Sequence, residues 1–109
     1  MTRILALLLA LASPAMAECE SVTLNPAYDC RLSYEPTIRI VDFWSVDKVC
    51  RDMGLRRDGR VWGCHKGRDI VIPQENSGGI DITCQRRIFH HEHEHACGWP
   101  GDHPAAQFE

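Results

Sequence analysis

The sequence lacks several features that would each point to a particular class of protein. It contains no C-x-x-C pair, which excludes zinc ribbons and thioredoxin-type redox motifs. It has no repeats or interdomain linkers, and no apolar run after residue 17 that is long enough to cross a bilayer. Its charge is mildly acidic, because without Arg3 the chain carries 11 basic and 15 acidic residues, a formal charge of −4. We therefore expect a single domain whose partner is neither nucleic acid nor a membrane.

The first 17 residues have the pattern of a secretory signal peptide. Arg3 supplies the positive charge, residues 4–12 form a short apolar run, and Ala15-Met16-Ala17 is a small-x-small cleavage site. We expect cleavage between Ala17 and Glu18, leaving a mature chain, residues 18–109, that is periplasmic or secreted.

All the cysteines lie in the expected mature chain, and their number is even. A chain of about ninety residues buries a limited core, and small exported domains commonly compensate with disulfides. We expect three disulfides, whose pairing the sequence does not determine. The cysteines are Cys19, Cys30, Cys50, Cys64, Cys84 and Cys97.

The strongest chemical signal lies near the C-terminus, where the sequence reads His91-Glu92-His93-Glu94-His95. On a helix, at about 100° per residue, His91 and His95 lie about 40° apart on one face. Two imidazoles so placed can bind one cation, and zinc is a common partner of histidine nitrogens in four-coordinate sites. Glu92 lies about 60° from His95, where it can contact a metal-bound water. The spacing therefore predicts two zinc ligands and a general base for hydrolysis.

The motif could also form a strand that presents its three histidines on one face. Good helix formers between residues 85 and 96 favour a helix, and Gly98 supplies a C-terminal stop. We predict a helix from about residue 80 to 97, with Ser77 or Asp81 as its N-cap.

The remaining patterns predict a small α+β domain in the order strand, helix, β-hairpin and motif helix. β-Branched alternation predicts a strand at residues 37–41, and an apolar face predicts a helix at residues 45–53. Residues 61–65 and 69–73 are expected to pair as a hairpin, with Pro73 placing the second strand at a sheet edge. The tryptophans expected in the core are Trp44, Trp62 and Trp99.

Residues 91–98, H-E-H-E-H-A-C-G, resemble the H-E-x-x-H-x-x-G active-site segment of zincin metallopeptidases, especially the metzincins. In that family a helix carries two zinc histidines and a catalytic glutamate, and the glycine turns the chain towards a third ligand. The resemblance implies a minimal zincin-like domain that binds one Zn²⁺ through His91 and His95, with Glu92 as the catalytic base. It also implies a peptide or protein substrate, which residues 70–73 could bind as an added strand.

The sequence departs from the family pattern at the third ligand. The corresponding position is Gly101, which has no side chain to coordinate a metal. Asp102 and His103 follow directly, and we expect one of them to be the ligand, with His103 favoured because imidazole is the commoner third ligand. No Met-turn is recognised, because the only methionine of the expected mature chain is Met53, upstream of the motif.

The same five letters also match H-x-x-E-H, the inverted zincin order. In that order Glu94 competes with Glu92 as the base, and Glu94 could instead orient a ligand histidine. The sequence therefore predicts a zinc-dependent metallopeptidase with Glu92 as its base. The alternative is a periplasmic metal-binding or metal-buffering protein without catalysis, in which the histidines from 90 to 103 hold metals loosely. Substrate and oligomeric state stay open.

Overall fold

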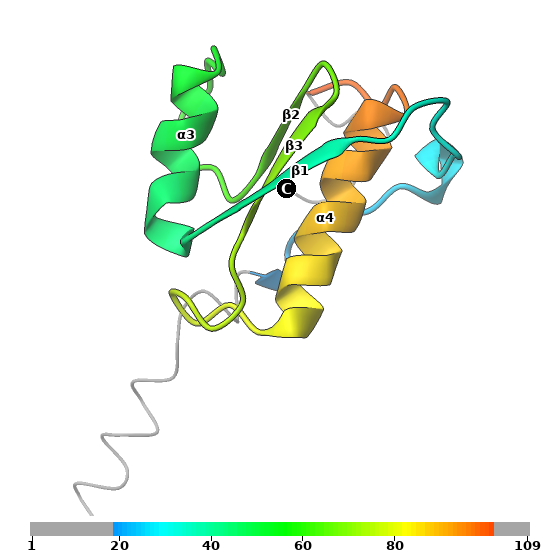
Figure 1. Cartoon of the computed structure of the whole chain (residues 1–109). Coiled ribbons are helices and arrows are strands. Elements are labelled where there is room, and N and C mark those ends of the chain that lie inside the picture. Colours follow the sequence, from blue (N-terminus) through cyan, green and yellow to red (C-terminus); the bar gives the residue numbers. More distant parts are fainter. Residues whose placement is uncertain (1–18, 102–109) are drawn as a thin grey trace, which may run out of the picture.

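The computed structural model describes residues 19–101, in which a three-stranded sheet lies between two helices (Figure 1). The predicted α+β class and the order strand, helix, hairpin and helix are confirmed. Within residues 19–101, no helix is long and apolar enough to cross a membrane. The predicted signal peptide lies outside this range. The elements are η1 (Pro26–Tyr28), β1 (Thr37–Val41), η2 (Phe43–Ser45), α3 (Val46–Asp52), β2 (Cys64–Lys66), β3 (Asp69–Pro73) and α4 (Ile82–Ala96).

Strand β3 lies at the centre of the sheet, parallel to β1 and antiparallel to β2, so the prediction that it is an edge strand is wrong. Gln74 donates its N–H to Val41 O at 2.7 Å, and successive residues of a strand point their N–H groups to opposite sides. The Pro73 nitrogen therefore faces the side of β2. Strand β2 begins at Cys64, opposite Val71, so Pro73 lies beyond it and costs the sheet no hydrogen bond.

The two faces of β3 pack against different helices. Ile70 and Ile72 contact the core beneath α4, whereas Val71 contacts the core beneath α3. A strand covered on both faces is apolar throughout, which explains the unbroken Ile-Val-Ile run. The two helices therefore pack against opposite faces of the sheet.

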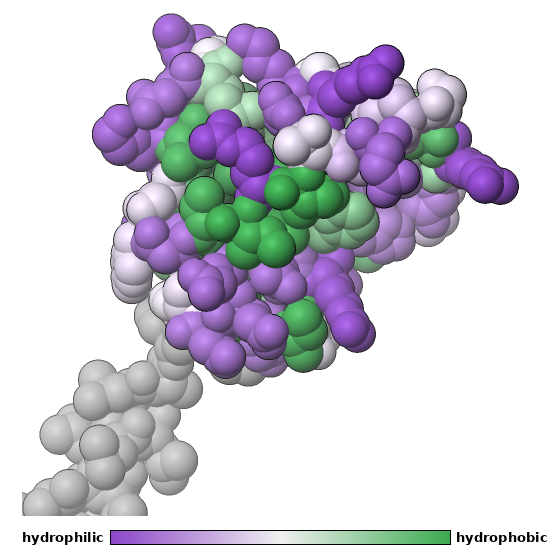
Figure 2. Space-filling view, in the orientation of Figure 1, coloured by the Kyte–Doolittle hydropathy of each residue, from purple (hydrophilic) through white to green (hydrophobic). Residues whose placement is uncertain are grey.

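Strand β1 is exposed because α4 packs against β2 and β3. Ile38 and Ile40 pair in register with Ile70 and Ile72, yet they are 38% and 55% exposed. Figure 2 shows the resulting apolar patch over β1, in the orientation of Figure 1.

The tryptophans differ in burial. Trp99 is buried, and Trp62 packs beside the core under α4, as expected. Trp44 is 66% exposed, so its placement in the core is wrong. Instead, the Arg60 guanidinium lies over its ring, 4.9 Å from the ring centroid.

Helix α4 has local signals at both ends. The Asp81 carboxylate accepts the Cys84 N–H at 2.7 Å and caps the first turn. Ser77 has another role, because its hydroxyl accepts the Phe43 N–H. After the C-terminal cap, Gly98 has φ +107°, a conformation that glycine adopts readily. The motif therefore lies on a helix, as predicted.

All six cysteines form disulfides, which confirms the predicted number. Two of the bonds join the N-terminal segment, residues 19–30, to α4 and its C-terminal cap, and the third joins α3 to β2. The pairs are Cys19–Cys84, Cys30–Cys97 and Cys50–Cys64.

Replacing both Cys30 and Cys97 with serine tests how much the N-terminal segment depends on its second disulfide. The two residues are 67 apart in sequence, so the bond removes about 4 kcal/mol of loop entropy from the unfolded chain. We expect the free energy of unfolding to fall by about that amount in urea titrations. An unchanged midpoint would contradict this account.

Candidate metal centre

His91 and His95 lie one turn apart on α4, and the backbone fixes both rings. His91 Nδ1 lies 2.5 Å from Thr23 O, and His95 Nδ1 lies 2.7 Å from Trp99 O. A carbonyl only accepts hydrogen bonds, so each Nδ1 carries the proton of the neutral ring. Each Nε2 is then left with its lone pair.

These two lone pairs converge. His91 Nε2 and His95 Nε2 lie 3.2 Å apart. With both rings in the tautomer that their backbone partners require, neither nitrogen has a proton to donate to the other. The pair is therefore arranged as two acceptors that can share a cation.

Burial keeps both rings neutral. It lowers the pKa of His91 to about 4, against the opposing effect of the Thr23 carbonyl, and it lowers the pKa of His95 as well. Metal ligation requires neutral imidazole, so both residues are ready to bind a metal at neutral pH.

Glu92 is buried beside the two histidines. It is 6% exposed, and burial raises its pKa to about 8, while Arg57 has the smaller, opposite effect. Because an opposite charge nearby favours the ionised form, a cation held by the histidines would lower this pKa again. With this pKa, Glu92 is mostly protonated at neutral pH in the metal-free chain, and a bound cation would favour its carboxylate.

Gly63 makes room for Glu92. A Cβ atom at this position would lie 2.9 Å from Ile88 Cγ2, 3.0 Å from Val71 O and 3.3 Å from Glu92 Cγ. The loop before β2 therefore approaches α4 more closely than any larger residue allows. This contact is not predictable from the sequence, because residues 63 and 92 are far apart in the chain.

Two cavities meet at Glu92. One of about 210 Å³ extends towards His65, His95 and Trp99. The other, of about 310 Å³, extends towards Thr23 and Trp62. The residues lining both are Arg57, Val61, Gly63, His91 and Glu92.

Trp99 forms one wall of the first cavity. Its ring stacks on His95, with 5.1 Å between centroids and 17° between planes, and its carbonyl holds the same ring. Trp99 is therefore a core residue that also orients a candidate ligand. The turn at Gly98 brings it there, because the Trp99 N–H bonds back to Glu94 O.

The described residues supply two of the ligands expected of the metal. Among residues 19–101, no third histidine, cysteine or carboxylate atom lies within 4.8 Å of both facing nitrogens. The predicted third ligands, Asp102 and His103, lie outside the described residues. Gly101, which precedes them, lines the first cavity together with His95 and Trp99.

Glu94, the competing base, points away from this centre and does not line either cavity at Glu92. It is fully buried, with Oε1 accepting the Asn25 N–H at 2.9 Å. Burial raises its pKa, and the Asp29 carboxyl beside it raises the pKa further. Asp29, His90 and Glu94 form a separate cluster that the sequence analysis did not anticipate, although the i, i+4 spacing of His90 and Glu94 was visible.

No known protein family, curated protein sequence or solved structure matches this chain. The zincin hypothesis therefore depends on the motif and on the geometry described above.

Replacing Gly63 with alanine tests the close approach between the loop and α4. A backbone carbonyl at 3.0 Å cannot move aside cheaply, so we expect a loss of about 1–3 kcal/mol in stability and a displaced Glu92. Urea denaturation measures the first effect. Gly101→Ala is the matched control, because its Cβ meets nothing within 4 Å, and equal stabilities of the two variants would contradict the packing.

The pH dependence of stability tests the burial of Glu92 in metal-free protein. Its pKa of about 8 exceeds its ordinary value of 4.5, so the folded chain binds more protons than the unfolded chain between these values. Stability then falls as pH rises towards 8. The lowered histidine pKa values act in the opposite direction, but only below the ordinary value of 6.5.

We therefore expect urea denaturation with a chelator to show declining stability between about pH 6.5 and 8. Glu92→Gln should make this decline less steep, and the remainder would come from Glu94, whose raised pKa acts in the same direction. Glu75→Gln, an exposed substitution in the loop after β3, should retain it. A decline that is equally steep in Glu92→Gln would mean that Glu92 is not responsible for it.

Proposed function

We propose that this chain is an exported zinc-dependent peptidase in which His91 and His95 hold the metal and Glu92 is the general base. One observation carries the proposal. The Nε2 atoms of the two histidines converge to 3.2 Å while the backbone holds both Nδ1 atoms.

The spacing of these nitrogens fits zinc. Two ligands at the usual Zn–N distance of about 2.0–2.1 Å in tetrahedral geometry lie about 3.3–3.4 Å apart. The pair thus needs little adjustment to bind one ion. Hydrogen bonds from Nδ1 to backbone carbonyls are also the usual way in which proteins orient metal-binding histidines.

The third ligand would come from Asp102 or His103. Both residues directly follow Gly101 in the sequence, and Gly101 lines the first cavity. Either side chain would complete a site of three protein ligands with one position open, the arrangement typical of catalytic zinc.

Glu92 would perform the proton transfers. Zinc, when bound, supplies Lewis acidity that makes water more acidic and polarises a scissile carbonyl. The Glu92 carboxylate, ionised beside the cation, would accept a proton from water in the cavity and return it to the leaving nitrogen. Its buried position limits competition from solvent for that proton.

The cavities on either side of Glu92 favour an extended substrate. Strand β2 is an edge of the three-stranded sheet, and its residues Cys64 and His65 line the first cavity. A peptide could add to this edge by backbone hydrogen bonds. We therefore propose β2 as the strand that would bind the substrate, in place of β3, which was expected from the sequence.

The three disulfides support an oxidising compartment, the periplasm or the outside of the cell. Such bonds persist where no reducing pool of thiols keeps cysteines reduced.

Glu92→Gln tests the proposed catalysis. We expect the oxidised, zinc-loaded mature chain to cleave members of a peptide library and the variant to lose at least a hundredfold in rate, since general-base catalysis contributes about 10²–10⁴-fold. Zinc content, measured by elemental mass spectrometry, should be unchanged. Glu75→Gln is the control and should cleave normally.

Retained activity in Glu92→Gln would contradict the assignment of the base. A wild-type chain that binds zinc and cleaves no peptide would instead favour the metal-buffering alternative.

A further inference from the structure

We propose that Asp29, His90 and Glu94 form a second metal site, which would bind a divalent cation such as Zn²⁺ and is distinct from the His91–His95 centre. One ligand atom from each of these residues lies within 4.8 Å of the others. The inference does not depend on peptidase activity.

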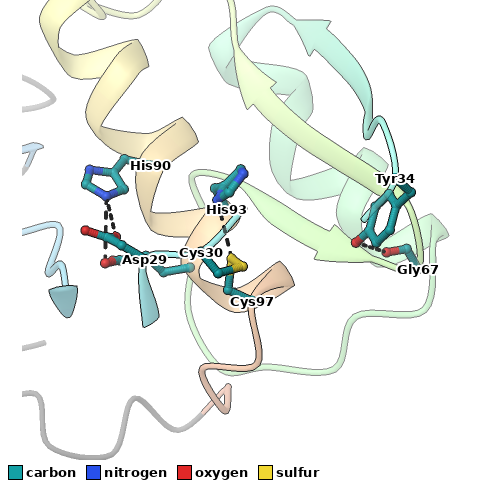
Figure 3. Close-up of a disulfide and its surroundings, with 8 residues drawn as sticks. Asp29, Cys30, Tyr34, Gly67, His90, His93 and Cys97 are labelled. Atoms are coloured by element: carbon teal, nitrogen blue, oxygen red, sulfur yellow. Dashed lines mark hydrogen bonds and ion pairs between the residues drawn. A yellow bond between two sulfur atoms is a disulfide. The ribbon is translucent and has the colours of Figure 1, made fainter. Parts of the chain in front are cut away.

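The three side chains converge on one point. His90 Nε2 lies 2.8 Å from Asp29 Oδ1 and 3.7 Å from Glu94 Oε2. Figure 3 shows Asp29 and His90 directed towards each other, near the Cys30–Cys97 disulfide. A proton lies between His90 Nε2 and Asp29. A cation bound to all three residues would take its place, because a histidine nitrogen binds a metal only after losing its proton.

Glu94 provides the second, independent observation. Its side chain is completely buried, and within residues 19–101 Oε2 has no hydrogen-bond partner. Its other oxygen is held by the Asn25 N–H at 2.9 Å. A buried carboxylate oxygen without a partner is costly, and a cation between Glu94 and Asp29 would satisfy it.

The donor set indicates the kind of ion. One imidazole nitrogen and two carboxylate oxygens suit zinc or manganese and carry the two negative charges that balance a divalent cation. The side chains of Asp29 and His90 are 48% and 45% exposed, so an ion can enter from solvent and keep water as a further ligand.

The site is separate from the first centre although His90 and His91 are neighbours in sequence. His91 faces Thr23 and His95, whereas His90 faces Asp29. An ion held by Asp29 and α4 would fasten the N-terminal segment, which also supplies the Thr23 carbonyl to His91. We therefore assign the second metal a structural role.

Zinc titration of the chelator-stripped, oxidised mature chain by calorimetry tests the proposal. We expect two zinc ions per chain in the wild type and one in Asp29→Asn, in which the exposed ligand is lost. His90→Gln should also bind one. Asp58→Asn, which removes an exposed carboxylate elsewhere, should bind two.

His91→Gln separates this site from the proposed catalytic one. That variant should still bind one ion, and Mn²⁺ added to it should broaden the amide resonances of Asn25, Asp29 and His90 by paramagnetic relaxation. If Asp29→Asn and His90→Gln bind as much zinc as the wild type, or if Mn²⁺ leaves these resonances sharp, the proposal is overturned. Loss of peptidase activity alone would leave it intact.

Discussion

The candidate centre depends on the attachment of the N-terminal segment to α4. The Cys19–Cys84 and Cys30–Cys97 disulfides hold residues 19–30 along the helix. Between them, Thr23 offers its carbonyl to His91 Nδ1. A helix alone would place His91 and His95 on one face, but it would not select the tautomer or the ring orientation of either residue. The disulfides thus stabilise the fold and also hold the segment that orients His91.

The opposite side of the centre depends on the sheet. Strand β3 carries β2, and Gly63 lets the loop before β2 press against α4 at Ile88 and Glu92. Glu92 is buried in this region, and the burial raises the pKa of its carboxyl to about 8. Burial therefore has two effects in the same cavity: at neutral pH it favours the neutral form of both histidines and the protonated form of the glutamate. Desolvation thus favours the neutral imidazoles that the proposed metal site requires.

Local signals made the boundaries of α3, α4, β1 and β3 predictable. Asp81 and Gly98 act on residues within one turn of themselves, so the motif helix could be placed to within about two residues from sequence. The prediction that residues 69–73 form an edge strand was wrong. Pro73 lacks one N–H group, which excludes one hydrogen bond but does not exclude pairing along the rest of the strand. Strand β2 is shorter than predicted and begins only at Cys64, opposite Val71, so it does not pair with Pro73.

Contacts between distant residues were beyond sequence reasoning. The Thr23 carbonyl is a backbone group 68 residues from His91, and no side-chain pattern marks it. The same holds for Gly63 beside Glu92. The pairing of Asp29 with His90 likewise required the Cys30–Cys97 disulfide, whose partners could not be chosen from six cysteines.

The most direct test of the central claim is to follow the ring nitrogens of the histidines by NMR as zinc is added to the oxidised, metal-free chain. The account predicts that Nδ1 of His91 and His95 is protonated before zinc is added and stays so. It also predicts that both Nε2 resonances shift together, with the same dependence on zinc concentration, because one ion binds both. If zinc shifts other histidines and leaves these two Nε2 atoms unchanged, or if either ring is protonated at Nε2 in the metal-free chain, the account is contradicted.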